Sequence, residues 1–140
     1  MAQKTVSAEK DPKIAQETKA FLNALNSAGG PPMETLSPKE ARKVLVDAQA
    51  SVKFDYSAVS ESTHKEAKED LPVFLFFHGG GWVLGDYPTH RRLVRDLVVH
   101  SGAAAVFPDY SPAPEAQFPV AIEQAYAATE WVANNGKEIG

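Results

Sequence analysis

The residues of this chain that could do chemistry are concentrated in His78-Gly79-Gly80-Gly81-Trp82. Three successive glycines leave backbone N–H groups uncovered by any Cβ atom, so this loop can cradle an anion. Such a loop has three known uses: a phosphate-binding P-loop, a dinucleotide-binding turn, and an oxyanion hole for acyl transfer. The structural alternative is a turn that only lets a strand pack closely on the following helix.

The neighbouring residues argue against both nucleotide-binding uses. Gly80 and Gly85 have the spacing of a P-loop, but Asp86 stands where that motif needs Lys. A carboxylate there would repel a phosphate. The dinucleotide fingerprint needs a third glycine where this chain has Leu84. An oxyanion hole is therefore favoured, since lipases and esterases carry an HGGG-type loop after a strand.

The segments around the loop alternate between strand and helix patterns. Residues 73–77 and 103–107 are short apolar runs, typical of strands buried on both faces. Helices are predicted at about 89–101 and at 119–135, each followed by a glycine, with an ordered proline-rich loop at 108–118 between the second strand and the second helix. This order predicts an α/β fold with a parallel sheet. In the helix predicted at about 89–101, the residues expected to face inward are Leu93, Val94, Leu97 and Val98.

Two short amphipathic helices are predicted upstream. The first begins at Asp11, with Pro12 in its first turn, and is ended by the glycines and prolines at 29–32. The second begins at Ser37, where Ser37-Pro38-Lys39-Glu40 forms a capping box. Alternating apolar residues predict a short strand at 52–56, and residues 60–70 are a charged loop.

Composition limits the class of protein. The 140 residues carry a formal net charge of −4 with mixed signs, which argues against a nucleic-acid binder. The absence of cysteine excludes disulfides, thiolate metal sites and a Cys nucleophile. Apolar runs reach only five residues, and the first ten residues are polar, so neither a membrane span nor a signal peptide is expected. We expect a cytoplasmic protein without a metal ion or a cofactor.

Several motifs in one order resemble the hormone-sensitive-lipase family of α/β-hydrolase carboxylesterases. The first segment, residues 71–86, contains the glycine loop. The second, Pro-Asp-Tyr-Ser-Pro-Ala-Pro-Glu at 108–115, is similar to the family's D-Y-R-L-A-P-E segment. The resemblance continues through residues 118–128 and implies an incomplete α/β-hydrolase fold. Its predicted parts are cap-like helices at 1–50, a short strand and charged loop at 51–70, and a parallel βαβα core at 71–140.

The resemblance also implies roles for the loop residues. Gly79, Gly80 and Gly81 form the oxyanion hole, with the Gly80 and Gly81 amides as donors. His78 orders the loop by hydrogen bonding and is not the catalytic base. Trp82 either walls the acyl pocket or is a buried anchor under the loop. The substrate implied for the complete enzyme is a small-molecule ester.

No catalytic triad residue is expected in this chain. The family's nucleophilic Ser lies in a G-x-S-x-G elbow after the next strand, and the acid and base follow it. No G-x-S-x-G occurs in this sequence, so we expect it to be inactive alone. The segment around Ser27 is similar to an elbow, but Leu25 replaces the leading glycine and the segment follows a helix. Ser27 is therefore expected in a helix C-terminal turn.

Two other functional hypotheses stay open. The chain could be a non-catalytic binding module that keeps the glycine loop as an anion or acyl pocket, or a truncated product without a function of its own. In the family's sheet, the strand that bears the elbow covers the free edge of the strand at 73–77. Without that cover, we expect poor stability or self-association through the bare edge.

Overall fold

The computed structural model describes residues 10–51, 53–55, 57 and 71–139. The chain divides into two compact units, with the boundary between Thr35 and Leu36. The predicted charged loop at 60–70 lies outside the described residues, as does part of the strand predicted at 52–56. Residues 53–55 themselves form no strand. The division at residues 50 and 70 stays a prediction.

The first unit contains α1 (Gln16–Ser27) and a short 3-10 turn, η2 (Met33–Thr35). The predicted start of this helix at Asp11 is wrong. The Asp11 carboxylate accepts a hydrogen bond from the Lys13 amide at 2.9 Å, which closes a local turn in place of a first helical turn. The expected stop is confirmed, because Gly29 and Gly30 both adopt positive φ directly after the helix.

The second unit opens with α2 (Pro38–Ala50), which begins where the capping box predicts. The Glu40 amide donates to Ser37 Oγ at 3.3 Å, and the Ser37 amide donates to the Glu40 carboxylate at 2.9 Å. These two bonds satisfy backbone donors that the first helical turn leaves free. The cap therefore fixes the start of the helix that reaches the glycine loop.

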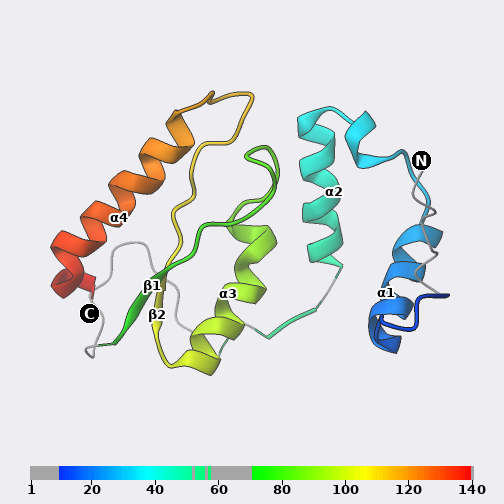
Figure 1. Cartoon of the computed structure of the whole chain (residues 1–140), viewed down its shortest axis with the longest axis horizontal. Helices are drawn as coiled ribbons and strands as arrows, with labels where there is room; N and C mark the ends of the chain where they lie inside the picture. The colour runs from blue at the N-terminus through cyan, green and yellow to red at the C-terminus, as the bar shows by residue number, and fades with distance from the viewer. Residues whose placement is uncertain (1–9, 52, 56, 58–70, 140) are drawn as a thin grey trace. The chain divides into compact units, whose positions relative to one another are not determined.

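A parallel pair of strands, β1 (Val73–Leu75) and β2 (Ala104–Val106), forms the sheet (Figure 1). Val73 pairs with Ala104, and Leu75 pairs with Val106. The predicted parallel βαβα order is confirmed. The strands are shorter than predicted and only half-buried, and Phe77 is 43% exposed. In the described part of the chain each strand pairs with a single neighbour, so each strand has one unpaired edge.

The crossover helix is α3 (Tyr87–Ser101), which begins two residues before the predicted start. Asp86 and Thr89 form its capping box, and Gly102 ends it in the left-handed conformation as predicted. Val94 is buried as expected, but the inward placement of Leu93 and Leu97 is wrong, since they are 50% and 40% exposed. The helix contacts α2 and β2, and these two elements leave the Leu93 side open.

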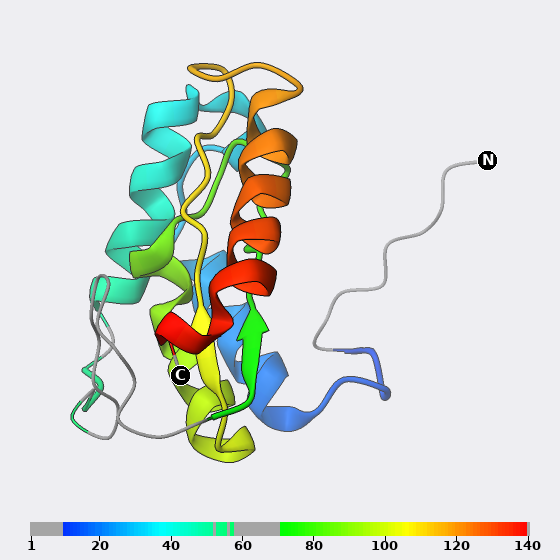
Figure 2. The ribbon, with the colours of Figure 1, turned by 90° about the vertical axis from the view of Figure 1, so that its left-hand side faces the viewer.

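The last helix, α4 (Val120–Ile139), runs past its predicted end at 135. Asn135 leaves helical geometry, with φ −122° and ψ 18°, but Gly136 does not adopt positive φ and the helix resumes. Figures 1 and 2 show the sheet between α3 on one side and α4 on the other. Among the described residues, no helix has both the length and the apolar character to cross a membrane.

Candidate functional site

The glycine loop follows β1 and turns its carbonyl oxygens toward internal donors. The Gly80 carbonyl accepts hydrogen bonds from the Val83 amide at 3.2 Å and the Leu84 amide at 2.9 Å. The Trp82 carbonyl accepts one from the Ala113 amide at 2.7 Å. The loop therefore holds its own acceptors in place, and a second loop helps to fix it.

Two backbone amides of the same loop lack an acceptor among the described residues. Within the described part of the chain, the Gly80 and Gly81 amides donate no hydrogen bond. In a trans peptide unit the C=O and the N–H point in opposite directions. Because the Gly80 carbonyl turns inward to Val83 and Leu84, the Gly81 N–H points away from these partners. Successive free amides can bind an anion, so the oxyanion-hole role of these two glycines stays a prediction.

Only one of the three successive glycines is required sterically. A Cβ on Gly80 would lie 2.0 Å from the Leu84 carbonyl oxygen, and Gly80 has φ +122°. A Cβ on Gly79 or Gly81 would meet nothing within 4 Å. Gly80 thus lets the turn close, whereas Gly79 and Gly81 border open space in which a ligand could lie.

His78 lies beneath this turn and is only 4% exposed. Its Nδ1 lies 2.8 Å from the Gly79 carbonyl oxygen, so the Nδ1–H donates to that carbonyl. The Tyr110 hydroxyl donates to the His78 carbonyl, and the two rings stack with centroids 4.3 Å apart. These contacts fit a loop-ordering histidine, and that role stays a prediction. Burial, with a smaller contribution from Asp109, raises the pKa of Tyr110, so its hydroxyl remains a donor at neutral pH.

Trp82 does not lie buried under the loop. Half of its surface is exposed, and its ring tilts against Tyr110 with centroids 5.4 Å apart. The buried-anchor interpretation is therefore wrong, and the role as a pocket wall stays a prediction. Trp82 has φ +63°, close to the +62° of Gly81, so this part of the loop accepts an L side chain in the left-handed conformation.

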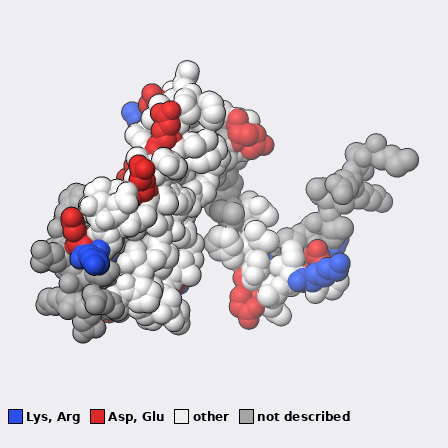
Figure 3. Space-filling view, turned by 60° about the vertical axis from the view of Figure 1, so that its left-hand side comes forward, with Lys and Arg blue, Asp and Glu red and all other residues white. Residues whose placement is uncertain are grey.

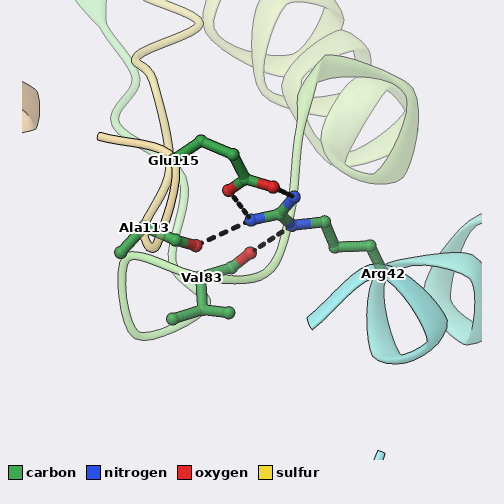
Figure 4. A network of polar contacts seen from close by, with 4 residues as sticks. All are labelled: Arg42, Val83, Ala113 and Glu115. Carbon is green, nitrogen blue, oxygen red and sulfur yellow. Dashed lines mark hydrogen bonds and ion pairs between the residues drawn. The ribbon is translucent and has the colours of Figure 1, made fainter. Parts of the chain in front are cut away.

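Arg42 is a site residue that the sequence reasoning missed. From α2, its Nε donates to the Val83 carbonyl at 2.7 Å and its Nη2 donates to the Ala113 carbonyl at 2.7 Å (Figure 4). Two further bonds, at 2.9 and 2.8 Å, join it to the Glu115 carboxylate. No signal pointed to this residue, because an Arg beside an apolar helix stripe is indistinguishable from any solvated charge. Gly85 was also missed: a Cβ there would lie 2.7 Å from His78 Nδ1.

The comparisons with known proteins agree with this architecture. A family profile described as the alpha/beta hydrolase fold matches residues 74–140. A thermostable esterase from Pseudomonas putida has a solved structure with 55% identity and a TM-score of 0.83, covering 93% of this chain and 46% of that one. The Mycobacterium tuberculosis esterase LipI is 49% identical over 71 residues, which are 51% of this chain and 22% of LipI. These matches confirm the resemblance to the hormone-sensitive-lipase family of α/β-hydrolase carboxylesterases.

The match to this carboxylesterase family extends beyond the glycine loop. An esterase from Gibberella moniliformis is 34% identical over 125 residues, which are 84% of this chain and 39% of that protein. The chain therefore spans about half the length of the solved esterase from Pseudomonas putida, and less of the curated relatives. Ser27, the elbow-like serine, is the last residue of α1, as expected for a helix C-terminal turn.

Acidic pH should lower the stability of this chain through Glu115. The hydrogen bonds from Arg42 lower the pKa of Glu115 from 4.5 to about 2. Because the pKa is depressed in the folded state, this stabilisation is complete above the unfolded value and is lost as the pH falls toward 2. We expect the gap in urea midpoint between wild type and Glu115→Gln to shrink across that pH range. The side chain is largely exposed, so the gap will be small. A gap that stays constant with pH would contradict the ion pair.

Proposed function

We propose that this chain supplies the oxyanion hole of a carboxylic-ester hydrolase, with the Gly80 and Gly81 amides as its donors. The observation that carries the proposal is which backbone groups of the loop already make hydrogen bonds and which do not. The carbonyl oxygens of Gly79, Gly80 and Trp82 accept hydrogen bonds from other groups of the chain, while the Gly80 and Gly81 amides donate to no other described residue. A pair of fixed, unpaired N–H groups after a strand is what a developing oxyanion needs.

The chemistry follows from this arrangement. In ester hydrolysis, attack on the acyl carbon moves negative charge onto the carbonyl oxygen. Two backbone donors placed beforehand stabilise that charge without reorganising, and losing one such donor costs about 2.7–4 kcal/mol in the activation free energy. His78 keeps the loop in shape and is not the general base, since the residue is only 4% exposed and its Nε2 is enclosed, out of reach of a nucleophile at the loop surface. Trp82 borders the acyl group of a small ester substrate.

The 140-residue chain by itself should not hydrolyse esters. Hydrolysis needs a nucleophile, and the sequence contains no G-x-S-x-G elbow and no cysteine. We expect p-nitrophenyl acetate to react no faster with the purified chain than with buffer. Turnover that disappears in Gly80→Pro would contradict this, because it would mean that the loop already serves a nucleophile within these residues.

The alternative is a binding module that uses the same two amides without catalysis. It predicts saturable binding of a carboxylate or a boronate and no turnover. The two proposals separate when a second polypeptide that carries a hydrolase elbow is added. A catalytic part should gain esterase activity that Gly80→Pro removes, whereas a binding module should not.

We also propose that the isolated chain self-associates through the free edge of β1. The unpaired N–H and C=O groups of an edge strand attract other chains, and Phe77 beside this strand is 43% exposed. Apolar side chains of α4 are also exposed, with Tyr126 at 69%, and Figure 3 shows a largely uncharged surface on the larger unit. Sedimentation should therefore give species larger than a monomer. A monomer with a cooperative melting transition would contradict self-association.

A further inference from the structure

We propose that Arg42 is a positioning residue for the oxyanion loop, acting from α2 through two backbone carbonyls. This inference rests on the proposed function. The guanidinium bonds the Val83 carbonyl on the glycine loop and the Ala113 carbonyl on the proline-rich loop, each at 2.7 Å (Figure 4). Arg42 is therefore shared by the two loops that bound the candidate site.

These contacts complete a closed circuit of hydrogen bonds. Arg42 holds Val83 and Ala113, and the Ala113 amide donates to the Trp82 carbonyl at 2.7 Å. Two consecutive carbonyls of the glycine loop, those of Trp82 and Val83, are thus fixed from outside the loop. Removing Arg42 opens the circuit at two places at once.

These hydrogen bonds affect the proposed oxyanion donors because a peptide unit is rigid, so fixing its carbonyl also fixes its N–H. The Val83 and Leu84 amides donate to the Gly80 carbonyl at 3.2 and 2.9 Å, and the Leu84 N–H shares a peptide unit with the Val83 carbonyl that Arg42 holds. The position of Val83 and Leu84 therefore sets the tilt of the Gly80–Gly81 peptide unit. The Gly81 N–H lies on the opposite side of that rigid unit. A shift of Val83 therefore rotates the Gly81 donor away from the direction in which it would meet an oxyanion.

Arginine is suited to this task and lysine is not. The planar guanidinium offers five N–H donors in fixed directions, and Arg42 uses four hydrogen bonds at once. An ammonium is a single point of charge on a flexible stem, so it cannot span Val83 and Ala113 while it pairs with Glu115. Glu115 holds the Arg42 guanidinium in place but contacts neither the Val83 nor the Ala113 carbonyl. Removing the Glu115 carboxylate should therefore disturb the glycine loop less than removing Arg42.

The test uses the full chain labelled with 15N only at its nine glycines, so that few NMR resonances report on the loop. The variants are Arg42→Met, Arg42→Lys and Glu115→Gln. The matched control is Lys43→Met, which removes a neighbouring cation of α2 that pairs, among the described residues, with Asp47. Gly102, in its helix cap, reports whether the fold survives. Sodium acetate is the anion probe.

We expect Arg42→Met to move the Gly80 and Gly81 resonances while Gly102 stays in place. We expect it to weaken acetate binding about tenfold, the effect of misaligning one hydrogen bond to a charged group. Arg42→Lys should not restore either signal, Glu115→Gln should give a smaller change at the same glycines, and Lys43→Met should give none. If the Gly102 resonance of Arg42→Met also moves, that variant has lost its fold, and the Glu115→Gln spectrum tests the inference instead. Shifts at Gly80 and Gly81 in Glu115→Gln then support the inference, and unmoved resonances contradict it.

The inference would be overturned by unmoved loop resonances in Arg42→Met, by full rescue in Arg42→Lys, or by random-coil positions for Gly80 and Gly81 in the wild type. The proposed function fails in a different way. If acetate leaves the wild-type Gly80 and Gly81 resonances unmoved while the Arg42→Met substitution shifts them, Arg42 positions the loop but the loop is not an oxyanion hole. If acetate binds wild type and Arg42→Met equally, the loop is an oxyanion hole but Arg42 does not position it.

Discussion

Gly80→Ala is expected to collapse the glycine loop and to lower the free energy of unfolding by about 3 kcal/mol or more. A Cβ at this position would lie 2.0 Å from the Leu84 carbonyl oxygen and 2.6 Å from its carbonyl carbon. Both atoms belong to the backbone, so no side-chain rotation can relieve the overlap. The φ angle of +122° adds strain, since L residues rarely adopt it.

Gly81→Ala is the matched control for this effect. Its φ of +62° falls in the left-handed helical region, and a Cβ there would meet nothing within 4 Å. We expect it to cost only about 1–2 kcal/mol, the ordinary penalty of that conformation. Urea unfolding followed by circular dichroism measures both variants. Equal losses in the two variants would mean that the turn is not closed by Gly80.

Tyr110→Phe is expected to give the second large effect, a loss of about 1–3 kcal/mol in the free energy of unfolding. The hydroxyl donates to the His78 carbonyl in a buried place, where Tyr110 is only 5% exposed. Phenylalanine keeps the stacked ring but leaves that carbonyl without this donor. Tyr110→Ala should lose more, about 3–5 kcal/mol, because it also empties the space beside the His78 ring.

Tyr126→Phe is the control for Tyr110→Phe. Tyr126 is 69% exposed on α4, so removal of its hydroxyl should change the urea midpoint little. Comparable losses in Tyr110→Phe and Tyr126→Phe would show that the contact with His78 contributes nothing specific. A selective loss in Tyr110→Phe would place His78 and the loop above it in one cooperative unit.

Local signals predicted most of the elements that position the site. The capping box at Ser37 and the glycine at 102 fixed a helix start and a helix end, because each acts through its own neighbours. The two apolar runs predicted the parallel pair β1 and β2. Their three-residue length was not predictable, because strand length depends on which neighbours are present.

The errors have physical causes of the same kind. Asp11 closes a turn on the Lys13 amide in place of a helix start. Helical geometry does break at Asn135, where the end was predicted, but the chain then returns to a helix and Gly136 does not adopt positive φ. Arg42 could not be found from sequence, because its two carbonyl partners lie in loops that are 41 and 71 residues away along the chain. Long-range bonds to backbone atoms leave no pattern in side-chain type.

The most direct test of the central claim, that Gly80 and Gly81 are oxyanion donors, is an acetate titration of the glycine-labelled wild-type chain. Acetamide, a neutral molecule of similar shape, is the control ligand. We expect saturable shifts of the Gly80 and Gly81 N–H resonances with acetate, none with acetamide, and no change at Gly29 and Gly30, which lie in the other unit. Unmoved Gly80 and Gly81 resonances, or equal shifts with acetate and acetamide, would contradict an oxyanion hole in this loop.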